Sequence, residues 1–348
     1  RLGRAAAAPL PIKRKGEAMK RKKTFRDWIA SGKVNKRLVI VTFMLVPMLL
    51  LIVFTYFPFA KMVQFSFYDM AYLGDREFVG LENYIEVFTR DDCFQALKLS
   101  GYYMVGAFVQ LALALFFASI LSMKMKGAGI FKGLLFFPYM VCGIAVGFIF
   151  KFFYTRGFVL DTVLQWIGFD LDNLPYWLRD KSINNISLAA TSIWRYMGQN
   201  MVLFIGAIMS VDASMYEAAD IDGATGWQKF RYVTFPSIKT IIVLNLILSI
   251  TGSLSVFEPP YVTTRGEFGT GTYFVIMNEL AHESQKVGLA SAMAIVLLII
   301  ILIATALQKL FFWYFFGEGE KEAYRVIRKR KKREKQQAAG AARKGGTL

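Results

Sequence analysis

Six long apolar runs divide this chain and decide what it can fold into. A helix needs about 20 apolar residues to cross the hydrocarbon core of a membrane. The runs that meet this requirement are Leu38–Phe57, Leu99–Leu121, Phe131–Phe153, Ile186–Met209, Ile238–Phe257 and Leu289–Phe316. Backbone polar groups must bond internally in lipid, and these runs are too long and uniformly apolar for barrel strands. The sequence therefore predicts an all-α, polytopic membrane protein with six transmembrane helices, the first and third kinked or bounded by Pro47 and Pro138.

The composition agrees with a membrane protein and offers little to enzyme chemistry. Of 348 residues, 55% are hydrophobic, and 32 Phe stand against a single His, a combination that few soluble domains show. That histidine, His282, and two distant cysteines, Cys93 and Cys142, form no zinc-binding cluster in the sequence. The phosphate-binding pattern G-x-x-x-x-G-K-[ST] does not occur in the sequence either. We therefore predict that this chain is not an enzyme, with no catalytic residues, no metal site and no cofactor of its own.

Basic residues concentrate at the two ends of the chain, which carries a formal net charge of +17. Such runs can bind nucleic acid, but here both flank apolar helices and fit the positive-inside rule. An even number of spans puts both termini on one side, which the rule makes the cytoplasm. We predict a basic cytoplasmic segment over residues 1–37, a transmembrane domain over 38–316 and a basic cytoplasmic tail over 317–348. Residues 1–18 precede Met19, and we interpret them as an upstream fusion or a misassigned start.

The charges of the connecting segments support this orientation. Residues 58–98 hold four basic and seven acidic residues, which favours an external segment. We also predict that residues 154–185 and 258–288 are external, and that the short turn with Lys124, Lys126 and Lys132 is internal. The stretch "MYEAADIDGATGWQKFRYVTFP", residues 215–236, then lies on the cytoplasmic side between the fourth and fifth helices.

This cytoplasmic stretch predicts two short helices joined by a tight turn, here called the elbow (residues 212–236). Asp212 can cap the first helix, and Gly223 can end it in a left-handed turn. Thr225 and Gln228 have the spacing of a capping box for the second helix, and Pro236 is expected to close it before the next span. Interfacial helices usually carry a basic polar face. The elbow is instead small and acidic, so we predict that it docks on a protein.

The order of residues in the elbow resembles the EAA motif of ABC importer permeases. The motif is carried by Glu217-Ala218-Ala219, by Asp222-Gly223-Ala224, and by Val233, Phe235 and Pro236 at the expected distances. Phe235 stands where leucine is common, and Thr240 where a further proline is usual. The resemblance implies that the elbow is a coupling helix seated in a cleft of a cytoplasmic ATPase. The implied coupling residues are Glu217, Ala218, Ala219, Asp222, Gly223, Ala224, Phe230 and Pro236.

Two more segments resemble carbohydrate importers of the maltose-permease type, namely residues 78–97 and 256–300. In the second, Arg265-Gly266-Glu267 stands where a Gly-Gly-Pro triplet is usual. The resemblance covers Leu38 to Phe316. It implies the transmembrane domain of a type I ABC importer, of the binding-protein-dependent, MetI-like family.

Polar residues inside the fourth and fifth predicted helices are candidates for the substrate path, because polar groups at membrane depth usually face a cavity or a partner. The candidates are Trp194, Arg195, Tyr196, Gln199, Asn245, Ser249, Ser253, Phe257 and Glu258. Their spacing places Arg195, Tyr196 and Gln199 on one helix face. Helix–helix hydrogen bonding remains an alternative for each residue, and Arg195 has the alternative of pairing with Glu258. We interpret Gln110 as packing and Lys151 as snorkelling to the interface.

Together these features predict a permease subunit of an ATP-driven importer of a carbohydrate, most simply an oligosaccharide, in a bacterial cell membrane. The resemblance implies a second homologous permease as heterodimer partner, two ATPase subunits that hold ATP and Mg, and an extracellular or periplasmic solute-binding protein. One alternative is the same type of importer with glycerol phosphate or another polyol derivative as its substrate. Others are an ion-coupled carrier that acts alone and a membrane scaffold without transport.

Overall fold

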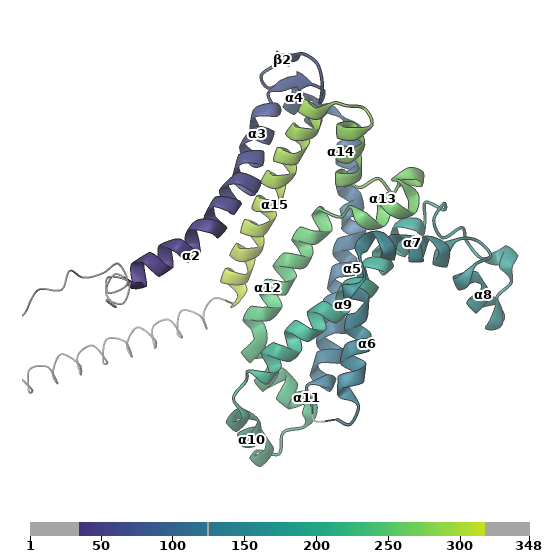
Figure 1. Ribbon diagram of the computed structural model, residues 1–348. Helices are drawn as coiled ribbons and strands as arrows, with labels where there is room; N and C mark the ends of the chain where they lie inside the picture. Colours follow the sequence, from purple (N-terminus) through teal and green to yellow (C-terminus); the bar gives the residue numbers. More distant parts are fainter. Residues whose placement is uncertain (1–34, 124, 317–348) are drawn as a thin grey trace, which may run out of the picture. The chain divides into compact units, whose positions relative to one another are not determined.

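The computed structural model describes residues 35–123 and 125–316, so most of the two predicted basic terminal segments lies outside the described residues (Figure 1). The chain divides into two compact units, residues 1–61 and 62–348, which are described separately. Helix α2 (Asn35–Leu51) passes through Pro47 without a break. It continues through a π turn, η1 (Ile52–Tyr56), into α3 (Phe57–Phe65). The first predicted helix is therefore present and ends at Phe65 rather than at Phe57.

The second unit is built almost entirely of helices. Its α-helices are α4 (Glu82–Thr89), α5 (Asp91–Leu121), α6 (Ala128–Met140), α7 (Gly143–Tyr154), α8 (Val159–Trp166), α9 (Asn184–Met209), α10 (Ala213–Ile221), α11 (Gly226–Lys229), α12 (Phe235–Leu254), α13 (Glu258–Thr264), α14 (Tyr273–His282) and α15 (Val287–Phe316). Shorter pieces are the 3₁₀ turns η2 (Leu171–Asn173) and η4 (Glu267–Gly269) and the π turn η3 (Phe230–Thr234). An antiparallel hairpin of β1 (Tyr68–Met70) and β2 (Arg76–Phe78), which the sequence did not predict, is the one sheet among the described residues.

Helix length and hydropathy confirm a polytopic, all-α membrane protein. Four helices of the described chain are long and apolar enough to cross a membrane, or up to six if each of two bent helix pairs counts as one span. The predicted fourth, fifth and sixth spans correspond to α9, α12 and α15. The second, α5, begins at Asp91 rather than at Leu99.

The third predicted span is not a single helix, which corrects the sequence-based prediction. It breaks into α6 and α7, whose axes differ by 98°. Pro138 lies in the last turn of α6, and Val141 and Cys142 take extended backbone angles between the two helices. Proline has no N–H to donate and its ring crowds the carbonyl four residues earlier, so it weakens the last turns of α6, which ends at Met140. Helix α7 is thereby free to pack against α13.

One buried core of the second unit forms where α9 packs against α5, α6 and α12 (Figure 1). Met201 and Phe204 of α9 are fully buried there, together with Ala114 and Ala118 of α5. At Gly198 a side chain would overlap the backbone of α6, because a Cβ atom there would meet the Leu135 carbonyl. Small residues let membrane helices approach this closely. Because lipid is as apolar as the helix surfaces, the hydrophobic effect does not hold the helices together, and close van der Waals packing does so instead. This close crossing fixes α9, which carries much of the candidate site.

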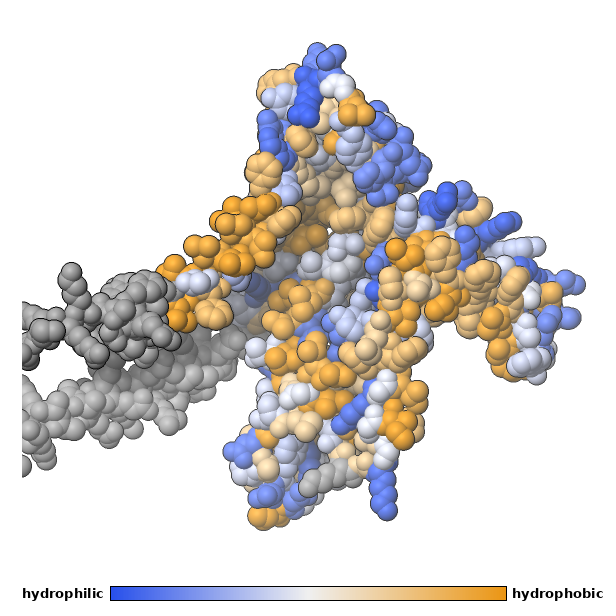
Figure 2. Space-filling model, viewed as in Figure 1, coloured by the Kyte–Doolittle hydropathy of each residue, from blue (hydrophilic) through white to orange (hydrophobic). Residues whose placement is uncertain are grey.

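Apolar side chains also cover outward faces of the helices. Ile303, Leu307 and Leu310 of α15 are each more than half exposed. Figure 2 shows hydrophilic side chains gathered over the β hairpin, over α13 and α8, and over the elbow, with apolar ones over the helices between. An exposed apolar band between two polar zones is the surface expected of a protein that lipid surrounds.

Candidate functional site

The first helix of the elbow, α10, is capped as the sequence predicts. The side chain of Asp212 accepts a hydrogen bond from the Ser214 backbone N–H at 3.0 Å. This hydrogen bond lowers the pKa of the Asp212 carboxyl below its usual range. The cap is therefore a carboxylate at neutral pH, which also suits the positive end of the helix dipole.

A left-handed turn at Gly223 ends α10. The residue has a φ of +71°, a conformation that glycine adopts without strain. The Gly223 N–H donates to the Asp220 carbonyl at 3.1 Å, and the Ala224 N–H donates to the Ala219 carbonyl at 2.9 Å. This pair of bonds is a Schellman motif, which satisfies carbonyls that the helix end would leave without a donor. The turn is thus fixed by backbone geometry.

The second helix of the elbow, α11, starts with the predicted capping box. The Thr225 N–H donates to Gln228 Oε1 at 2.7 Å, and the Gln228 N–H donates to Thr225 Oγ1 at 3.4 Å. The prediction that Pro236 closes this helix is wrong. Helix α11 runs through the π turn η3 directly into α12, and Pro236 lies in the first turn of α12, where its missing N–H is not needed. The elbow is therefore continuous with a membrane-spanning helix.

The elbow offers a surface that the described chain does not cover. Glu217, Ala218, Asp222 and Gly223 are exposed, and the side chain of Ile221 is 86% exposed. The other predicted coupling residues, Ala219, Ala224 and Phe230, are half-buried, and Pro236 is exposed. The acidic edge is partly engaged, because Asp220 pairs with Lys229 across the turn. Glu217 has no partner among the described residues.

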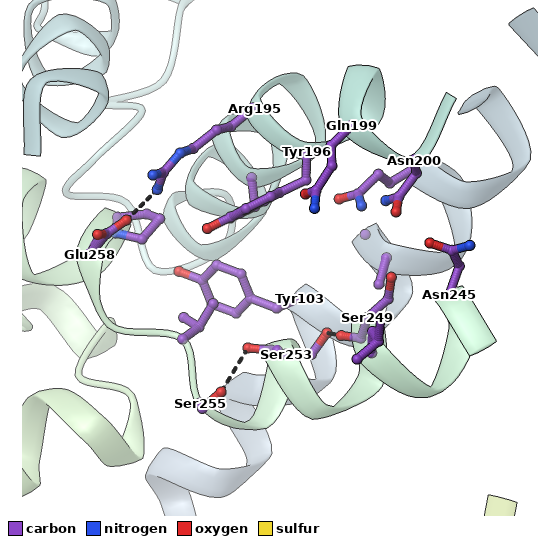
Figure 3. A pocket seen from close by; sticks show the side chains of 18 of the residues that line it. Tyr103, Arg195, Tyr196, Gln199, Asn200, Asn245, Ser249, Ser253, Ser255 and Glu258 are labelled. Carbon is purple, nitrogen blue, oxygen red and sulfur yellow. Dashed lines mark hydrogen bonds and ion pairs between the residues drawn. The ribbon is translucent and has the colours of Figure 1, made fainter. Parts of the chain in front are cut away.

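A cavity of about 510 Å³ lies between α5, α9, α12 and the start of α13 (Figure 3). Arg195, Tyr196 and Gln199 of α9 face Asn245, Ser249 and Ser253 of α12 across it, and Phe257 and Glu258 line one end. Eight of the nine predicted path residues therefore surround one space, as their three- and four-residue spacing implies.

Trp194 is the predicted path residue that the structure places elsewhere. It does not line the cavity, and its ring packs edge-on against Phe150 of α7 with 5.1 Å between the ring centroids. Successive residues of an α-helix point about 100° apart. Trp194 therefore occupies the neighbouring face of α9 and supports the packing of α7.

The cavity also contains residues that the sequence did not identify as part of the path. Tyr103 and Gln110 of α5 form a third wall, and Asn200, Ser192 and Ser255 add further polar groups. Gln110 was expected to serve packing only. An amide or a phenol within an apolar run can be recognised in the sequence as a candidate for lining a cavity. Whether its side chain faces the cavity depends on which helices become neighbours.

Several polar atoms in this cavity have no partner among the described residues. Asn245 is 1% exposed, and its Nδ2 donates to the Ile241 carbonyl at 2.8 Å while its Oδ1 is unpaired. The buried Tyr103 hydroxyl is unpaired as well. Buried polar groups are normally satisfied. Both atoms are also buried from solvent in this structure, so they are hydrogen-bonding groups in the cavity wall that the described chain leaves unused.

Arg195 has the alternative role that the sequence left open, because it forms an ion pair with Glu258, the first residue of α13. Its guanidinium also lies over the ring of Tyr196, 5.1 Å from the centroid. The pair joins α9 to α13 at the end of the cavity.

Apolar spans, a polar cavity between them and an elbow continuous with one span define a membrane transport protein. The chain matches the family model described as "Binding-protein-dependent transport system inner membrane component" over residues 110–312. It is 32% identical to the probable ABC transporter permease protein YurN of Bacillus subtilis over 273 residues, which is 76% of this chain and 92% of YurN. This chain therefore belongs to the family of binding-protein-dependent ABC transporter permeases, and the resemblance seen in the sequence is confirmed.

Two further comparisons agree. The chain is 30% identical to the arabinooligosaccharides transport system permease protein AraP of Bacillus subtilis over 232 residues, 64% of this chain and 72% of AraP. Its fold matches a subunit in the crystal structure of a bacterial alginate ABC transporter in complex with an alginate pentasaccharide-bound periplasmic protein. That match has a TM-score of 0.66 at 19% identity and covers 80% of this chain and 96% of that one. The family is that of a membrane component of a transport system, which confirms that the chain is not an enzyme.

Proposed function

We propose that this chain is one of two membrane subunits of an ATP-driven carbohydrate importer, and that it forms half of the translocation path. The observation that carries this proposal is the continuity between the cavity and the elbow. Helix α9 leads from the cavity to α10, and α11 leads back through η3 into the cavity-lining α12. A displacement of the elbow would therefore act on two walls of the cavity.

The chemistry of the cavity suits a carbohydrate. Sugars present C–H faces that pack on aromatic rings and hydroxyls that need donors and acceptors. Tyr103, Tyr196 and Phe257 supply rings, and the Gln, Asn and Ser side chains of α5, α9 and α12 supply hydrogen bonds. A phosphate cargo would need several cationic groups, whereas the one cationic residue that lines the cavity is already paired with Glu258.

The partners follow from the family and the elbow. A binding-protein-dependent system includes a solute-binding protein, which we expect on the external face. We infer that the elbow binds a cytoplasmic ATPase through the exposed residues Glu217, Ala218, Asp222 and Gly223, with two ATPase subunits holding ATP and Mg. The other half of the translocation path comes from a homologous permease. A solved relative in complex with its periplasmic protein supports this assembly at the level of the fold.

Purification of the tagged chain from its native membrane tests this function. We expect an ATPase and a second permease to co-purify. In proteoliposomes the complex should take up a saccharide only with ATP and the saccharide-loaded binding protein. Uptake driven by an ion gradient, by the chain alone and without nucleotide, would establish a secondary carrier instead.

Both termini are expected in the cytoplasm, and single cysteines can test this. Cys93 is 1% exposed, so it should react poorly with the reagent and can stay in place. Cys142 is exposed and is replaced by Ser first, so that it does not react in place of an introduced cysteine. Asp75→Cys in the hairpin should then react with a membrane-impermeant maleimide in intact cells. Lys126→Cys in the α5–α6 turn should react only after permeabilisation. The reverse labelling pattern would place the elbow outside and exclude its contact with an ATPase.

A further inference from the structure

The charged groups of the cavity neutralise each other. Among the residues that line it, Arg195 is the one basic residue and Glu258 the one acidic residue, and they form an ion pair. The remaining polar lining consists of amides, hydroxyls and phenols. This chain's wall of the cavity therefore has a net charge of zero, although it contains an arginine at membrane depth.

The ion pair is fitted into a junction of three helices. The Arg195 side chain is 14% exposed and the Glu258 side chain is 41% exposed. A Cβ atom at Gly143 would overlap both the Glu258 carboxylate and the Arg195 guanidinium. Gly143 is the first residue of α7, directly after the break between α6 and α7. The break thus places a residue without a side chain where the pair needs room.

We propose that the Arg195–Glu258 pair selects the charge of the substrate, so that the cavity takes an uncharged saccharide and excludes an anionic one. This inference rests on the proposed carbohydrate import. A carboxylate that enters the cavity must give up its hydration, which requires a counter-charge in return. It would find Nη1 of the guanidinium engaged by Glu258 and Nε buried, without a partner among the described residues, and it would face the negative charge of Glu258. A neutral saccharide loses nothing by this, because it needs the amides and hydroxyls alone.

Glu258 is the residue through which the selection can be inverted. Glu258→Gln keeps the size and a hydrogen-bond acceptor, and leaves Arg195 as a free cation. We expect affinity for neutral saccharide to change little, because the amides and hydroxyls that it binds remain in place. Affinity for a carboxylated saccharide should rise above that for the neutral one. The double variant Arg195→Gln/Glu258→Gln removes both charges and should restore the preference for the neutral form.

The test measures binding to the complete permease–ATPase complex in nanodiscs, without the binding protein, whose own specificity would otherwise hide that of the cavity. The probes are maltotriose, cellotriose and mannotriose, each beside its counterpart oxidised to a carboxylate at C6. The second permease is identical in all samples, so differences between variants report on this chain. For a probe that binds, the unsubstituted complex should prefer the neutral form by about tenfold or more, a preference of about 1.4 kcal/mol or more.

Equal affinity of the unsubstituted complex for both forms would overturn the inference, and this comparison needs no variant to fold. An unchanged preference in Glu258→Gln would overturn it too, provided that the complex assembles and melts normally. Gly143→Ala supplies a second route, because it displaces the pair without removing a charge and should weaken the preference. If no saccharide of either charge binds and none is taken up by proteoliposomes, the proposed carbohydrate import itself fails. Uptake of neutral and charged saccharides alike would instead overturn the charge selection and leave the proposed carbohydrate import standing.

Discussion

Replacing Gly223 by Val should abolish saccharide uptake almost completely while the membrane helices stay folded. The residue holds a φ of +71°, and a left-handed conformation costs an L-residue about 1–2 kcal/mol, more for a β-branched one. No atom lies within 4 Å of a Cβ built at this position. The defect would therefore come from the backbone of the turn, and not from a clash within the chain.

A distorted turn breaks the two bonds of the Schellman motif and reorients α10, on which Glu217 and the alanines lie. Because we propose that these residues contact the ATPase, we expect the ATPase to dissociate or to hydrolyse ATP without transport. The measurements are co-purified ATPase, its activity and uptake in proteoliposomes, all on the same preparation.

Two variants separate the turn conformation from side-chain bulk. Gly223→Asn should keep much of the uptake, because asparagine tolerates the left-handed region. Gly226→Ala adds a methyl group three residues away, where the backbone is helical and the space is open, and should behave like the unsubstituted chain. Full coupling in Gly223→Val would remove the elbow from the mechanism.

The elbow could be predicted from the sequence because its structure depends on short-range hydrogen bonds. Asp212, Gly223, Thr225 and Gln228 each act within about four residues of themselves, so their spacing already contains the geometry. The continuation of α11 into α12 was missed because a proline signals both the end of one helix and the first turn of the next.

The sequence predicted a kink or a boundary in the third span at Pro138, but the 98° angle between α6 and α7 and the helix that α7 then meets depend on contacts far along the chain. Residues 133–150 carry no charged side chain, and hydropathy alone cannot show the direction of a bend. Gly147 allows α7 to lie close to α13, since a Cβ there would be 2.6 Å from Val262. The same limit explains Tyr103, whose place in the cavity is set by the packing of α5 against α9 and α12.

For the cavity, the pattern of polar residues gave the helices and most of the faces, but an error of one residue was enough to misplace Trp194. Spacing within one helix predicts which side chains share a face. It does not predict which face meets a neighbour. Arg195 is a partial exception, since its pairing with Glu258, 63 positions away, was one of the alternatives that the sequence left open.

Replacing Asn245 by Leu should weaken saccharide transport. Its Oδ1 is a buried acceptor without a partner among the described residues, and we propose that a sugar hydroxyl donates to it once movement of α12 exposes it during transport. Leucine has a similar volume, so packing between α12 and α5 should survive. A ligand hydroxyl left without an acceptor in a buried site loses about 1–3 kcal/mol. We therefore expect the KM for saccharide-loaded binding protein, or the Kd for free saccharide, to rise at least about tenfold.

The matched control is Thr251→Val on the same helix, a change of similar size at a residue that does not line the cavity. It should leave uptake and affinity within about twofold, well under the tenfold that 1.4 kcal/mol represents. Thermal unfolding and basal ATPase activity of both variants show whether assembly is intact. Weaker binding in Asn245→Leu with unchanged assembly would support Oδ1 as a sugar acceptor. Unchanged affinity and uptake in Asn245→Leu would instead make Asn245 a packing residue, because they would show that no sugar hydroxyl depends on Oδ1.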